Sequence, residues 1–203
     1  LGSLPLRAYG IIIAVGMIVG VWWTSRRYAA RGGNPDTIFD VALWAIPLGV
    51  VGARLYHVVT SPEAYFGPGG DPWLALQIWR GGLGIWGGVA FGALGAFLAV
   101  KRAGVRFGPI ADSLAPALLV AQAIGRWGNW FNQELFGGPT TMPWGLQIDA
   151  AHMPDGYPVG TLFHPTFLYE CLWNLAGAAL IVALERRRRF AAGQLFGMYL
   201  MVY

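Results

Sequence analysis

The chain has 203 residues, of which 56% are hydrophobic and only 12% are charged, and its mean hydropathy is +0.50. A soluble domain usually carries about 25% charged residues, so this composition excludes an ordinary soluble globular protein. The net charge of +4 is modest, and its placement, described below, gives no indication of a nucleic-acid partner. The single cysteine, Cys171, excludes an internal disulfide framework and a multi-cysteine metal site.

Apolar runs divide the chain into predicted membrane-spanning helices, since a span needs roughly 20 mostly apolar residues. Five runs are complete, at residues 9–23 (which residues 4–8 extend), 39–59, 83–100, 110–125 and 167–184. A sixth run begins near Ala191 and is cut off at Tyr203. We therefore expect residues 1–203 to form a single integral-membrane domain, an all-α polytopic protein that is truncated at its C-terminus.

The basic residues predict how these helices are oriented. Ten of the fourteen lie in the connections after the first, third and fifth runs: Arg26, Arg27, Arg31, Lys101, Arg102, Arg106, Arg186, Arg187, Arg188 and Arg189. Alternate connections lie on one side of the membrane, and the positive-inside rule places these three in the cytoplasm. The N-terminus and residues 126–165 are then extracytoplasmic, and residues 136–165 are too polar to span.

The most informative segment is residues 125–137, where charged and amide side chains stand at the end of an apolar run. They are Arg126, Asn129, Asn132 and Glu134. An ionisable residue at membrane depth is costly and is by default a functional-site candidate. A guanidinium beside amide groups can hold a phosphate or carboxylate with fork geometry. The structural alternative is an arginine–glutamate pair that ties two helices together.

Further polar residues fall at a similar depth in the outer halves of other runs. Arg54 lies within the second run and His57 follows it, Glu170 enters the fifth run after His164, and Tyr9 opens the first. Together they predict a polar cleft in the outer leaflet, open to lipid and positively charged for an anionic head group. The alternatives are that Arg54 only pairs with Glu170, and that Tyr9 is only an interfacial aromatic.

We expect neither a metal nor a cofactor. The three histidines, His57, His152 and His164, lack the i,i+4 spacing of helical metal ligands. The sequence also lacks a Gly-x-Ser-x-Gly elbow and a Walker-type phosphate loop.

Residues 125–137 resemble the signature of the prolipoprotein diacylglyceryl transferases, Gly-Arg-x-Gly-Asn-aromatic-x-Asn-x-Glu-x-x-Gly. Residues 7–10, 52–56, 81–88 and 164–170 resemble other elements of the family in the same order. The resemblance covers essentially the whole chain. It implies seven spanning helices in the full-length family, of which a later one supplies a second arginine and an acidic residue.

The resemblance also implies a reaction in the bacterial plasma membrane, with the site toward the extracytoplasmic side. The diacylglyceryl group of phosphatidylglycerol moves to the thiol of a lipobox cysteine in a prolipoprotein signal peptide, and glycerol phosphate is released. The implied catalytic residues are Arg126, Glu134 and Tyr9. Those implied to bind phosphatidylglycerol are Arg126, Asn129, Asn132, Gly137, Arg54 and Glu170. The implied partners are these two substrates and the membrane lipids.

One departure from the family concerns the proton of the thiol. Many members have a histidine in the glycine-rich third helix, proposed as the base, where this chain has Trp86. An indole nitrogen only donates, so the acceptor would be His57, Tyr9, or water and hydroxide. The competing interpretations are a transporter, although the repeated halves common in transporters are not visible, and a non-catalytic lipid-binding membrane protein.

The orientation is testable by cysteine labelling in intact cells. We predict that a membrane-impermeant thiol reagent does not label Arg102→Cys, because the positive-inside rule places this position in the cytoplasm. Permeabilised cells provide the control in which the same variant becomes labelled. Efficient labelling of Arg102→Cys from outside would contradict the predicted topology.

Overall fold

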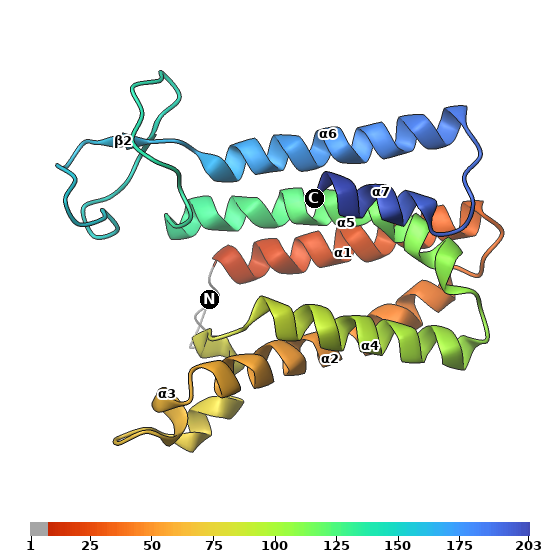
Figure 1. Cartoon of the computed structure of the whole chain (residues 1–203), viewed down its shortest axis with the longest axis horizontal. Helices are drawn as coiled ribbons and strands as arrows, with labels where there is room; N and C mark the ends of the chain where they lie inside the picture. The colour runs from red at the N-terminus through yellow and green to blue at the C-terminus, as the bar shows by residue number, and fades with distance from the viewer. Residues whose placement is uncertain (1–7) are drawn as a thin grey trace. The chain divides into compact units, whose positions relative to one another are not determined.

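The computed structural model describes residues 8–203, and most of them are helical (Figure 1). Residues 4–7, expected to extend the first span and to begin the family resemblance, lie outside the described residues. The chain divides into two compact units, one that joins the residues up to 27 with residues 108–203, and one of residues 28–107. The expectation of a single membrane domain stays a prediction.

The predicted set of five spanning helices is confirmed. Within residues 8–203, five helices are long and apolar enough to cross a membrane: α1 (Ala8–Ala30), α2 (Asp36–Thr60), α4 (Ile85–Ala103), α5 (Phe107–Asn132) and α6 (Thr166–Arg187). A short helix, α7 (Gln194–Val202), occupies the predicted sixth run. Two helices continue beyond their apolar runs, since backbone hydrogen bonding does not stop where polar residues begin. α1 includes Arg26 and Arg27, and α5 carries the first half of the polar signature to Asn132.

The unit of residues 28–107 is a helical hairpin of α2 and α4, whose backbones approach closely through glycines. A Cβ atom added at Gly87 would clash with the carbonyl oxygen of Gly52, and one added at Gly95 would lie 2.6 Å from that of Trp44. Small residues permit such packing in lipid, where apolar burial does not drive helix association. The connection holds α3 (Glu63–Phe66) and the 3₁₀ turns η1 (Pro72–Leu76) and η2 (Ile78–Arg80).

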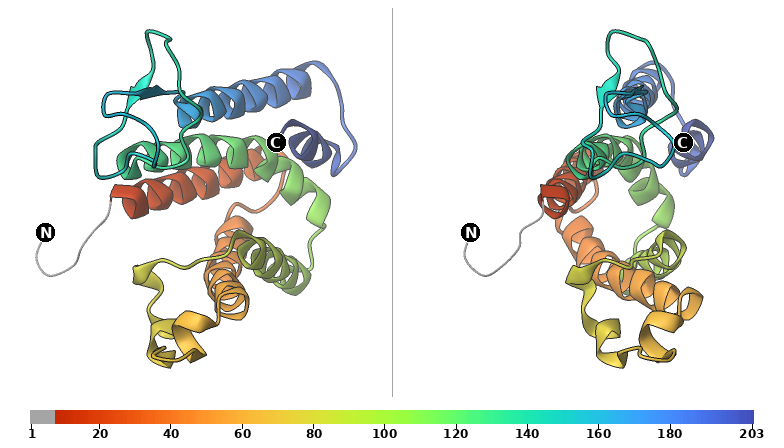
Figure 2. Two further views of the ribbon diagram at one scale, coloured as in Figure 1. Left: turned by 60° about the vertical axis from the view of Figure 1, so that its left-hand side comes forward. Right: turned by 90° about the vertical axis from the view of Figure 1, so that its left-hand side faces the viewer.

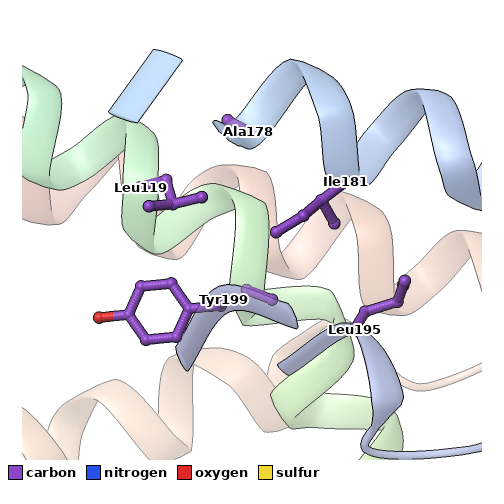
Figure 3. Close-up of a cluster of buried hydrophobic side chains, with 6 residues drawn as sticks. Leu119, Ala178, Ile181, Leu195 and Tyr199 are labelled. Carbon is purple, nitrogen blue, oxygen red and sulfur yellow. The ribbon is translucent and has the colours of Figure 1, made fainter. Parts of the chain in front are cut away.

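In the other unit, α1, α5 and α6 run alongside one another (Figure 2, in red, green and blue). α1 meets α5 at small residues, since a Cβ atom added at Gly16 would lie 2.9 Å from the carbonyl oxygen of Ala121. α7 packs against α5 and α6 in a cluster of buried side chains (Figure 3). They are Ala115, Leu119, Ala178, Ile181, Leu195 and Tyr199. Between α5 and α6, β1 (Leu146–Gln147) pairs antiparallel with β2 (Leu162–Phe163).

Charged groups hold together the end of this unit where α1 and α6 finish and α5 begins. Arg27 pairs with Glu185 at 2.6 Å and donates from Nε to the carbonyl oxygen of Ser113 at 3.1 Å. The buried carboxylate of Asp112 accepts from the backbone amides of Gly193 (2.8 Å) and Phe196 (3.1 Å). Asp112 thereby satisfies amide groups at the start of α7, which have no partner within the helix.

The α2–α4 contact can be tested with one methyl group. We predict that Gly87→Ala in the full-length protein lowers thermal stability by about 1–3 kcal/mol, because the added Cβ must push the two backbones apart. Gly197→Ala in α7 is the matched control, since nothing lies within 4 Å of its added Cβ. Thermal size-exclusion assays in detergent would compare the two variants. Equal midpoints would show that the backbones do not approach as closely as described.

Candidate functional site

The end of α5 turns back on itself through two left-handed residues. Gln133 has a φ of 49° and Leu135 a φ of 54°, whereas non-glycine residues rarely adopt positive values. Each left-handed residue costs roughly 1–3 kcal/mol and persists only where its surroundings hold it. Here the side-chain amide of Gln133 donates from Nε2 to Asp149 Oδ2 at 2.6 Å, and its Oε1 accepts from the backbone amide of Asp149 at 2.7 Å. The hydroxyl of Thr166 donates to the carbonyl oxygen of Leu135.

This turn brings Glu134 onto the two signature asparagines. Glu134 Oε1 accepts from Asn129 Nδ2 at 3.2 Å and from Asn132 Nδ2 at 3.0 Å. The backbone amide of Glu134 also donates to the carbonyl oxygen of Asn129 at 3.1 Å. Asn129 is buried, whereas Glu134 is exposed. Three predicted site residues are therefore assembled, with a carboxylate on the surface and its amide support beneath it.

Arg126 lies one helical turn earlier than Asn129 and forms an ion pair with Glu170 of α6. Its Nη2 also donates to the hydroxyl of Tyr203 at 3.3 Å. The side chains of Arg126 and Glu170 are 27% and 34% exposed, so a ligand could reach both. The pair joins two helices, as the structural interpretation of the signature expected. The carboxylate of this pair is Glu170, whereas Glu134 bonds to Asn129 and Asn132.

Two signature glycines are required because other segments touch the backbone there. A Cβ atom added at Gly128 would clash with Cδ2 of Tyr9, so the Tyr9 ring rests on α5 within the signature. At Gly137 an added Cβ would lie 2.9 Å from that of His164, and the Gly137 amide donates to the His164 carbonyl oxygen at 2.9 Å. Both glycines thus bring predicted site elements against the end of α5.

Three aromatic side chains, of which only His164 was named with the predicted cleft, form a hydrogen-bonded chain that includes Tyr169, the residue before Glu170. The Trp144 indole donates to the hydroxyl of Tyr169 at 2.9 Å, and this hydroxyl lies 3.0 Å from His164 Nδ1. Because an indole nitrogen only donates, the Tyr169 oxygen accepts from Trp144 and its proton is free to bond His164. The Gln133–Asp149 clamp was also missed, since these partners are far apart in sequence and no local pattern joins them.

Arg54 makes its described contacts within its own unit, so its pairing with Glu170 stays a prediction. It is 7% exposed, and its guanidinium donates to backbone carbonyl oxygens of its own unit. The acceptors are Ala75 (2.9 Å), Gly81 (2.6 Å), Gly82 (2.9 Å) and Leu74. Loop carbonyls therefore take the donors that were expected to face a head group.

An apolar groove of about 320 Å³ opens on the same stretch of α5 as Arg126. It is lined by Ile12, Ala123, Ile124, Trp127, Phe131, Cys171 and Leu175. Trp127 also packs edge-to-face on Phe167 with ring centroids 5.4 Å apart. Within residues 8–203, no three His, Cys, Asp or Glu side chains gather as they would around a metal ion. The site thus offers a cation, a carboxylate with two amides, and an apolar surface.

A family model described as prolipoprotein diacylglyceryl transferase matches residues 1–203. The chain belongs to this family. It is 54% identical over 203 residues to phosphatidylglycerol–prolipoprotein diacylglyceryl transferase 2 of Streptomyces coelicolor, covering all of this chain and 64% of that protein. Relatives named phosphatidylglycerol–prolipoprotein diacylglyceryl transferase occur in Paenarthrobacter aurescens (51% identity, 67% of its length) and Frankia alni (52%, 53% of its length), each aligned over the whole chain. The chain thus spans between about half and two thirds of these relatives.

Substitutions at Glu134 separate its structural role from its charge. We predict that Glu134→Gln keeps the fold, because the amide oxygen can still accept from Asn129 and Asn132. Glu134→Ala should destabilise the full-length protein by about 1–3 kcal/mol, because the buried Asn129 amide loses its partner. Thermal unfolding in detergent measures both variants. Equal losses in the two would show that the carboxylate charge itself stabilises the turn.

Proposed function

We propose that this protein transfers the diacylglyceryl group of phosphatidylglycerol to the thiol of a lipobox cysteine in a prolipoprotein. The thiolate sulfur attacks the carbon of the diacylglyceryl group that is bonded to the phosphate oxygen. A carbon–sulfur bond forms, the carbon–oxygen bond to phosphate breaks, and glycerol phosphate leaves with the electron pair. The observation that carries this proposal is the partly exposed Arg126 beside an apolar groove, within a chain that belongs to the transferase family.

Arg126 is proposed to bind the phosphate and to stabilise it as it departs. Among the described contacts of Arg126, only Nη2 is engaged, by Glu170 and Tyr203. Its Nη1 and Nε therefore remain available to phosphate oxygens. Glu170 and Tyr203 hold Nη2 of the guanidinium, and a donor held in place toward developing negative charge is the arrangement that lowers a barrier. A lysine would supply the charge without this planar fork.

The Glu134 cluster is proposed to recognise the polar head group next to the phosphate. In the described residues, the two asparagine amides bond Oε1, so Oε2 can accept from a hydroxyl of the head-group glycerol. Gly137 lets the His164 segment close on this end of α5. Tyr9, which rests on Gly128, is proposed to form the rim of the same site.

The groove beside Trp127 and Phe131 suits an acyl chain of the lipid donor. Its lining is almost entirely apolar, and its residues come from helices that are apolar enough to lie in the membrane. With the basic connections in the cytoplasm, the end of α5 faces the extracytoplasmic side of a bacterial plasma membrane. The lipid donor and an exported preprotein would meet on this side, and the surrounding membrane lipids would give the donor lateral access.

The proton of the thiol is proposed to pass to solvent. Trp86, at the position of the family histidine, is 70% exposed and cannot accept a proton. A free cysteine is already a few per cent thiolate near neutral pH, so hydroxide or water suffices as the acceptor.

A non-catalytic lipid-binding protein is the second candidate, because an arginine beside an apolar groove would also hold a lipid without reacting. The two functions differ in product. Only the transferase converts a lipobox peptide into a thioether that carries the glyceryl label of phosphatidylglycerol.

We predict that Arg126→Lys in the full-length protein lowers diacylglyceryl transfer roughly a hundredfold, as expected for one lost transition-state donor. The assay follows label from phosphatidylglycerol into a lipobox peptide. Arg102→Lys, at an exposed position in the last turn of α4, is the control. Near-normal transfer by Arg126→Lys would overturn the role of the fork. Failure of this variant to accumulate would instead favour a structural Arg126–Glu170 pair.

A further inference from the structure

The connection between α2 and α4 encloses a pocket of about 270 Å³ whose charged lining is entirely basic. Arg54, His57 and Arg80 line it together with Tyr65 and the backbone of Gly81 and Gly82. Among the described residues, no acidic side chain belongs to its lining. The lining residues all lie within residues 28–107, and two of them, Ala64 and Tyr65, belong to α3.

Arg54 gives this pocket a positive charge, and none of its described partners is a carboxylate. Its described partners are four carbonyl oxygens and the ring of Tyr65, which lies 5.1 Å from the guanidinium carbon. Carbonyl dipoles satisfy the donors but do not cancel the charge, and a buried cation without a counter-ion is unfavourable. An anion in the pocket would supply the missing counter-charge.

Two further side chains offer donors to such an anion. Arg80 is exposed, and among the described contacts only its backbone amide is hydrogen-bonded, to Gln77, so its guanidinium can donate to a ligand. The hydroxyl of Tyr65 lies 3.0 Å from His57 Nδ1, which leaves Nε2 of His57 as its free nitrogen. Gly82, with a φ of 73°, keeps the site open, because a Cβ atom there would lie 2.6 Å from Arg54 Nη1 and 3.0 Å from His57 Cε1.

Exposed aromatic and apolar side chains on the same connection indicate where the anion comes from. Trp73 is 72% exposed, Trp79 69%, and Phe66 and Leu76 66% each. Indole rings favour the interface between membrane and water, where lipid phosphates also lie. A cation pocket among such residues is placed to bind a lipid phosphate.

We propose that this pocket binds the phosphate of an anionic phospholipid, with Arg80 and His57 as direct donors and Arg54 as the buried counter-charge. Arg54 also positions the site, since its bonds to Leu74, Ala75, Gly81 and Gly82 hold the loop closed. The proposal does not rest on the transfer reaction, because neither Arg126 nor the Glu134 cluster enters the argument for this pocket.

The test uses the full-length protein in nanodiscs of phosphatidylcholine that contain phosphatidylglycerol with a photoreactive head group. Cross-linked peptides are mapped by mass spectrometry. We expect cross-links to residues 57–82, and Arg80→Gln should reduce them about tenfold, the effect of losing one charge-assisted hydrogen bond. Arg102→Gln removes one exposed arginine from the same unit and should leave them unchanged. Equal cross-linking in the two variants would overturn the site.

Competition identifies the source of the phosphate, and His57→Gln serves as a second variant if Arg80→Gln fails to fold. Unlabelled phosphatidylglycerol should abolish these cross-links, whereas glycerol phosphate and inorganic phosphate at the same concentration should not. Equal competition by a soluble phosphate would overturn a lipid ligand. Arg126→Lys should keep the Arg80-dependent cross-links while losing transfer, so failure of the proposed reaction and failure of this site give different results.

Discussion

Lipid offers no hydrogen-bond partners, so each charge carried by a membrane helix has to be satisfied by the protein itself. The structure meets this constraint differently at three charged residues. Arg27 uses a carboxylate and a carbonyl, Arg54 uses loop carbonyls and an aromatic ring, and Asp112 uses the amides at the start of α7. These side chains join segments far apart in sequence, so the bonds that they make also assemble the fold.

Arg126 differs from these residues in how much of it remains accessible. Its pair with Glu170 is only partly covered, whereas Arg54 is buried. The donors of a buried arginine bond to the protein and stabilise the fold, whereas a partly exposed arginine keeps donors that can bind a ligand. The left-handed turn at Gln133 and Leu135 also combines a structural part with an exposed one. Hydrogen bonds to Asp149 and from Thr166 stabilise its backbone, and the turn leaves Glu134 exposed.

The sequence predicted the helices well because the length of an apolar run is a local property, and that length decides whether a helix can cross the hydrocarbon core. It also grouped Asn129, Asn132 and Glu134, which the structure brings together because a helix and the following turn keep such close positions near one another. That Arg126 acts with them as one site stays a prediction. Partners were harder to predict. Arg54 was expected to face a head group or to pair with Glu170, whereas its described acceptors are carbonyl oxygens, which have no sequence signature. The Gln133–Asp149 clamp was invisible for a related reason, because a long loop separates α5 from its partner.

The division into two units has a consequence for the order of assembly during synthesis. α2 and α4 are successive spans, and their glycine contact closes only a short connection, so it can form as soon as both helices are in the bilayer. The other unit is discontinuous, because α1 packs with residues 108–203. α1 has no α5 to pack on until the whole hairpin has been made. α1 is therefore made before the α2–α4 hairpin but acquires its native neighbours after it, and Arg27 meets Glu185 only once α6 has been made.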